Sequence, residues 1–240
     1  MPAPEQVTLA RVSDLARDDL RQVLEVVRRE QMDPRQARRF LETVIPELGA
    51  KYESAASTVA ADLYTAQRAE RGLSAVLPFE VQHATPATAG RWEKLVGWGL
   101  GPAFDRLDWD AAFALLEGGL QRTVADAHRR TTMRAAIDDP ASKGWSRVGR
   151  GPATCDFCRM LISRGDVYRE HTVKFKSHDH CDCAAESRWE TRETAEMKAW
   201  SASKRTTRMK ALDARDGRGR MEAHRARIRE YTTYLREDGR

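Results

Sequence analysis

Two short stretches, Cys155-Asp156-Phe157-Cys158 and His178-Asp179-His180-Cys181-Asp182-Cys183, contain all four cysteines of this 240-residue chain. A C-x2-C turn places two thiolates on one side of a tight turn, at the separation that tetrahedral zinc requires. Cys181 and Cys183 are two residues apart, so in an extended segment their side chains point the same way. The two stretches together predict a zinc site.

Six candidate ligands are available for four coordination positions. Cys155 and Cys158 form the first pair. The second pair is Cys181 with Cys183, or His178 with one of these two cysteines. His180 is then left over, in contact with a ligand rather than with the metal.

Three other interpretations of the cysteines compete with a structural zinc site. Buried reduced thiols without metal are the first, and disulfides are the second, disfavoured because the N-terminal residues lack the pattern of a signal peptide. A catalytic zinc is the third. It needs an open coordination position and a general base, for which Asp179 and Asp182 are candidates. The large supply of sulfur ligands favours a closed, structural site.

Residues 1–140 are predicted to form a helical domain. Leu9, Val12, Leu15 and Ala16 recur at helical spacing and are expected to face a core. Asp33-Pro34 predicts a helix start, because the carboxylate caps the free N–H groups and proline needs none. Pro46 predicts a kink or a break. Residues 73–108 are expected to be loops with a short helix, and residues 109–137 a long helix.

Residues 141–187 are predicted to be a Cys/His zinc-binding module with short strands at 145–148, 167–169 and 172–175. Such a short segment builds little core alone, and zinc can supply folding free energy on the order of 10 kcal/mol. Residues 188–240 are expected to form a basic helical tail. The expected fold is therefore mainly α, with a helical N-terminal region, a small zinc-stabilised α+β module at the centre and long basic C-terminal helices.

The positive charge of the chain is concentrated near its C-terminus. The whole chain has a net charge of +5, and residues 191–240 contain 14 basic and 8 acidic side chains. This balance favours contact with nucleic acid or with an acidic partner, although exposed helices with ion pairs would give the same pattern. The sequence contains no apolar run long enough to span a bilayer, so we expect no membrane association.

The cysteine-rich region resembles the Mu F-like minor head proteins of tailed bacteriophages, in particular those of actinobacterial phages. The resemblance covers about residues 144–183. It depends on a C-x-F-C motif, a following R-G-x-V-Y and an H-x-x-C-x-C, which match at Cys155, Phe157, Cys158, Arg164, Gly165, Val167, Tyr168, His178, Cys181 and Cys183. It implies that His178, rather than His180, is a zinc ligand.

The resemblance also implies a function. Mu F-like proteins are minor, structural components of the phage head that act with the portal protein or major capsid protein in head assembly, DNA packaging or ejection, and some bind DNA. We therefore expect a non-enzymatic protein of the virion interior, present in the host cytoplasm during assembly. Its basic tail would contact double-stranded DNA. The alternative is a metal-dependent nuclease or toxin-like enzyme acting on nucleic acid; the sequence has no Walker A, G-x-S-x-G or H-E-x-x-H motif.

Overall fold

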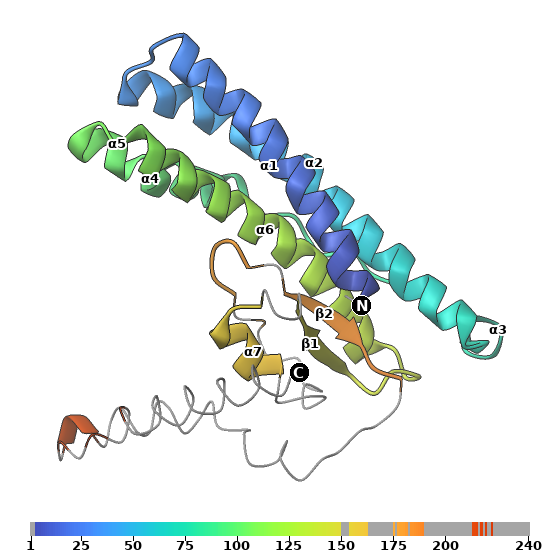
Figure 1. Ribbon diagram of the computed structural model, residues 1–240. Coiled ribbons are helices and arrows are strands. Elements are labelled where there is room, and N and C mark those ends of the chain that lie inside the picture. Colours follow the sequence, from blue (N-terminus) through green and yellow to red (C-terminus); the bar gives the residue numbers. More distant parts are fainter. Residues whose placement is uncertain are drawn as a thin grey trace.

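A computed structural model of the chain describes residues 3–149, 154–162, 175, 177–181 and 183–189, with a few positions between 213 and 222. These residues form a mainly helical protein with one small sheet (Figure 1). The motif at 164–168 and the predicted strand at 167–169 lie outside the described residues. So do the predicted strand at 172–175, apart from Phe175, and nearly all of the predicted tail.

Two long helices, α1 (Pro4–Arg29) and α2 (Pro34–Glu70), run antiparallel. Gln67 near the end of α2 donates a hydrogen bond to Glu5 at the start of α1, and Tyr52 donates to Asp19 halfway along. Asp33 begins α2 as predicted: its carboxylate accepts from two backbone N–H groups, and its own N–H donates to Gln36 in a capping box.

The third long helix, α6 (Trp109–Asp138), lies beside this pair (Figure 1). It confirms the helix predicted at 109–137. The segment before it contains α3 (Leu73–Val76), α4 (Ala89–Gly99) and α5 (Gly101–Arg106), where the sequence predicts only one short helix. Side chains of α1, α2, α4 and α6 share one apolar core, in which Trp92 and Leu116 are almost completely buried.

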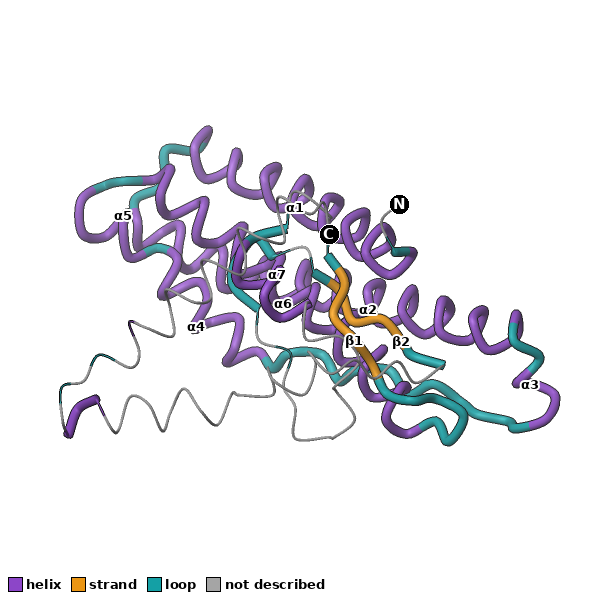
Figure 2. The backbone as a smooth tube through the Cα atoms, turned by 60° about the horizontal axis from the view of Figure 1, so that its bottom comes forward, coloured by secondary structure: helices purple, strands orange, loops and turns teal. Residues whose placement is uncertain are grey.

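The sheet consists of β1 (Trp145–Val148) and β2 (Ala184–Ser187), paired antiparallel with Trp145 opposite Ser187. The strand at 145–148 is confirmed, whereas β2 is not predicted by the sequence. The sheet packs against the helices because Ala184 contacts Leu9 of α1 and Ala125 of α6 in a small buried cluster. A short helix, α7 (Asp156–Ile162), follows β1 and lies beside the sheet (Figures 1 and 2).

One local prediction is wrong, and one of the two alternatives for Pro46 is excluded. Leu15 is 53% exposed, because the buried face of α1 passes through Val12, Ala16 and Leu20 and leaves Leu15 at its edge. The chain is not broken at Pro46: α2 continues through it, since the loss of one backbone N–H is outweighed by packing on both sides. None of the described helices combines the length and the apolar composition needed to cross a membrane.

Candidate metal centre

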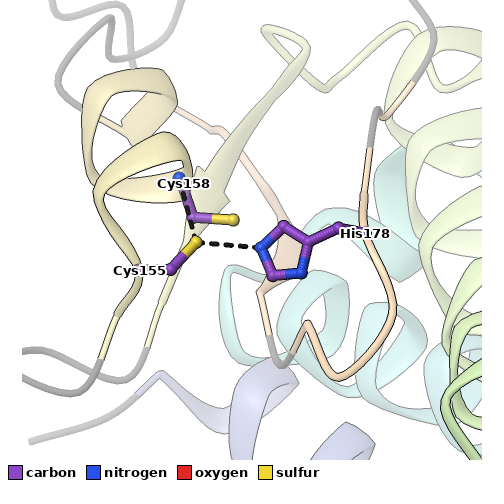
Figure 3. Close-up of side chains that lie close together, drawn as sticks. All are labelled: Cys155, Cys158 and His178. Carbon is purple, nitrogen blue, oxygen red and sulfur yellow. Dashed lines mark hydrogen bonds between the residues drawn. The ribbon is translucent and has the colours of Figure 1, made fainter.

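The first pair of candidate ligands lies at the beginning of α7. Cys155 directly precedes the helix, and its sulfur accepts a hydrogen bond from the backbone N–H of Cys158 at 3.4 Å (Figure 3). The backbone N–H of Arg159 donates to the carbonyl of Cys155 at 2.8 Å and closes the turn. Cys155 is exposed and Cys158 is buried. The C-x2-C stretch therefore forms the turn that the sequence predicts.

His178 faces this turn from the loop that precedes β2. Its Nε2 lies 3.0 Å from Sγ of Cys155 (Figure 3). Its Nδ1 lies 2.7 Å from the backbone carbonyl of Asp179. A carbonyl oxygen only accepts, so Nδ1 carries a proton and donates to it, and Nε2 is the ring nitrogen that faces Cys155. A carbonyl partner of this kind is typical of metal-binding histidines.

Five side chains form two overlapping groups that could hold a metal ion. Cys155, Cys158 and His178 form one group, and Cys158, Cys181 and Cys183 form the other. Within each group all ligand atoms lie within 4.8 Å of one another. Sulfurs around tetrahedral zinc lie about 3.8 Å apart when each bond is about 2.3 Å. The groups fit a metal of that size, and Cys158 belongs to both.

Hydrogen bonding favours the thiolate forms of Cys155 and Cys181 and the neutral thiol form of Cys158. Burial would raise the pKa of the Cys155 thiol, but its hydrogen bonds with His178 and with the N–H of Cys158 outweigh burial and lower the pKa. The hydrogen bond between Cys158 and Cys181, whose sulfurs are 3.4 Å apart, raises the pKa of Cys158 and lowers that of Cys181. Thiolates are the form in which cysteines bind metals.

Two buried arginines, which the sequence gave no reason to select, lie against the centre. Arg129 of α6 donates to the backbone carbonyls of Cys181 and Cys183, and Arg147 of β1 lies 3.6 Å from Sγ of Cys158. Both guanidinium groups also lie over the ring of Phe175, 4.7 and 3.6 Å from its centroid. The centre therefore has positive charge beside its sulfurs.

The other described histidines belong to neither metal-binding group. His180 has a positive φ of 59° and packs against Gly118 of α6, where an added Cβ would come within 2.9 Å of its Nε2. His128 is completely buried in α6, and His83 is exposed. His224 and Asp182 lie outside the described residues. The structure thus brings His178, but not His180, to the cysteines.

A family model described as VG15 protein matches residues 5–234, which is nearly the whole chain. The chain belongs to the VG15 family. The Gene 15 protein of Mycobacterium phage D29 is 35% identical over 137 residues, which are 54% of this chain and 47% of the relative. The Gene 15 protein of Mycobacterium phage L5 is 34% identical over 134 residues, 53% and 43% of the two chains. No solved structure matches.

The comparisons confirm a bacteriophage protein. The matched region of this VG15 chain spans less than half the length of the two mycobacteriophage relatives. Membership of the Mu F-like minor head family stays a prediction, as do the binding of a metal and its identity as zinc.

Proposed function

We propose that the protein is a structural, non-enzymatic minor head protein of a tailed bacteriophage, of the Mu F-like type. The observation that carries this proposal is the Cys/His centre at residues 155–183, in a chain that belongs to a family with phage relatives. The protein would act at the interior of the head, with the portal or major capsid protein, in morphogenesis and in DNA packaging or ejection.

The metal is proposed to be zinc in a structural role. The candidate ligands are sulfur and imidazole nitrogen, the donors typical of structural zinc sites, and neither group of ligands includes a carboxylate. Each strand of the adjoining sheet has only four residues, and an isolated two-stranded sheet is marginally stable. Zinc bound to Cys155, Cys158, His178 and one or both of Cys181 and Cys183 would join α7 to the segment that leads into β2.

The basic C-terminal region is proposed to contact double-stranded DNA. Residues 191–240 carry six more basic than acidic side chains, and the attraction of lysine and arginine to phosphates supplies most of the sequence-independent affinity for DNA. The helical bundle of α1, α2 and α6 would leave its outer surface for the portal or capsid. The location would be the virion, with the host cytoplasm as the place of assembly.

The alternative is a metal-dependent nuclease, and the experiment has to distinguish it from a structural head protein. A catalytic metal would need an open position and a nearby general base. Asp179, one of the two candidate bases, forms an ion pair with Arg122 at 3.0 Å and belongs to neither group that could hold a metal ion.

The experiment compares virions of a phage that carries the gene in wild-type form, with His178→Ala and with the matched control His83→Ala, which changes an exposed histidine that belongs to neither metal-binding group. Mass spectrometry of gradient-purified, DNA-filled heads should detect the wild-type and His83→Ala proteins. The His178→Ala protein should be depleted, with fewer filled heads. Absence of the wild-type protein from virions, or metal-dependent cleavage of DNA by the purified protein, would contradict the proposal.

A further inference from the structure

One face of α6 holds the loop that carries His178, Cys181 and Cys183. Gly118, Arg122, Asp126 and Arg129 are spaced by four, four and three residues, and side chains at this spacing share one face of a helix. Each of the four lies against this loop.

The contacts cover the loop from Ser177 to Cys183. Asp179 and His180 pack so closely on Gly118 that an added Cβ would come within 3.0 Å of both. Arg122 pairs with Asp179, and Asp126 accepts a hydrogen bond from the hydroxyl of Ser177 at 3.2 Å. The loop therefore packs on α6, a helix that contributes no residue to either metal-binding group.

Arg129 makes the most specific of these contacts. Its Nε donates to the carbonyl of Cys183 at 2.8 Å, and its Nη2 donates to the carbonyl of Cys181 at 2.7 Å. Its Nη1 donates to Asp126 at 3.0 Å, which fixes the guanidinium plane from the helix side. The side chain is fully buried, so these partners, and not water, accept one hydrogen bond from each of its three nitrogens.

This arrangement determines where the two sulfurs lie. The orientation of a cysteine side chain follows its backbone, and one planar guanidinium binds the backbone carbonyls of both Cys181 and Cys183. Its five donors have fixed directions, unlike the rotating ammonium of a lysine. Its positive charge also lies on the sulfur-rich side of the centre, where a metal bound by three or four thiolates would leave excess negative charge.

We propose that Arg129 is a positioning residue of the metal centre, which orients Cys181 and Cys183 for the metal through their backbone carbonyls and links the centre to α6. This inference depends on the metal centre of the proposed function. Removal of groups that orient metal ligands typically lowers metal affinity about 10- to 100-fold. We expect an effect of this size from the loss of the Arg129 side chain, although it touches no ligand sulfur.

The test measures Co²⁺ binding to the purified full-length chain by its visible absorption, and the Kd of Zn²⁺ by competition. Wild type is compared with Arg129→Gln, with Arg129→Lys and with the control Arg68→Gln, which removes another buried arginine that pairs with Asp139 instead. Arg129→Gln should raise the Kd about 10- to 100-fold and alter the Co²⁺ spectrum. Arg129→Lys should lie between this variant and wild type, and Arg68→Gln should bind as wild type does.

A wild-type Kd and Co²⁺ spectrum in folded Arg129→Gln would overturn the inference and leave the metal centre intact. If Arg129→Gln does not fold by circular dichroism, Arg129→Lys decides, and a wild-type Kd in that variant overturns the inference. An equal loss of metal affinity in Arg68→Gln would also overturn the inference, because the loss in Arg129→Gln would then reflect lower stability of the whole protein. Absence of metal binding by the wild-type chain would refute the metal centre itself.

Discussion

Arg68 and Asp139 form a buried ion pair that joins the end of α2 to the residue that follows α6. Nε of Arg68 lies 2.7 Å from Oδ2 of Asp139, and the two side chains are only 3% and 0% exposed. Tyr64 donates a second hydrogen bond to the same carboxylate at 2.9 Å. The pair fixes the point at which the chain leaves the helices for the sheet.

We predict that Asp139→Ala lowers the free energy of unfolding by about 3–5 kcal/mol, because it leaves a buried guanidinium without its counter-charge. The double change Arg68→Met with Asp139→Leu should cost less than this single change, since no buried charge is then unpaired. Urea unfolding followed by circular dichroism measures both. The exposed pair of Arg134 and Asp138 is the control, and Asp138→Ala should change stability by less than about 1 kcal/mol.

The packing of α4 on α2 predicts a second effect on stability. The indole of Trp92 lies directly over Gly49, so the Cβ of an alanine at 49 would overlap the ring. Gly49→Ala should therefore destabilise the protein by about 1–3 kcal/mol, as overpacking of a core does. At Gly90 in the first turn of α4, an added Cβ would meet nothing within 4 Å. Gly90→Ala should leave the thermal midpoint unchanged or raise it slightly, and a fall equal to that of Gly49→Ala would contradict this account.

The buried histidine of α6 predicts how stability depends on pH. Burial, together with the nearby charge of Arg129, lowers the pKa of His128 from its ordinary value of 6.5 to about 3. The unfolded chain then binds a proton at pH values where the folded chain does not. The contribution of neutral His128 to the free energy of unfolding is complete above pH 6.5. It is lost as the pH falls toward 3, at up to about 1.4 kcal/mol per pH unit.

The check is the free energy of unfolding of wild type and of His128→Gln, measured between pH 4 and pH 7.5. The difference between the two proteins should shrink, and can reverse in sign, as the pH falls below 6.5. His83→Gln is the control, since His83 is exposed. Parallel curves for wild type and His128→Gln would show that His128 does not titrate as its burial predicts.

The features that the sequence predicts correctly depend on neighbouring residues in the chain. Asp33 caps α2 through N–H groups two and three residues away, and the turn at Cys155 closes through Cys158 and Arg159. In contrast, β2 has the sequence Ala-Ala-Glu-Ser, which has little preference for a strand. It is a strand because it pairs with β1 and packs on α1 and α6, contacts that no local pattern reveals.

In the candidate site, too, some residues are predictable from the local sequence and others only from the tertiary structure. The spacing of the cysteines identifies the candidate ligands. The H-x-x-C-x-C resemblance favours His178 over His180, in agreement with the groups that the structure brings together. Arg129 lies more than fifty residues before the cysteines whose carbonyls it binds. In the sequence it is one of many arginines on a long helix, and only the tertiary structure distinguishes it.

The zinc content of the purified, reduced, full-length chain tests the central claim most directly. Elemental analysis by mass spectrometry should find one zinc per folded wild-type chain, with strong depletion in Cys155→Ser, His178→Ala and Cys183→Ser variants and no change in His83→Ala. A reduced, well-folded wild-type chain without zinc would contradict the claim, and the cysteines would then be thiols packed beside α6 without a metal.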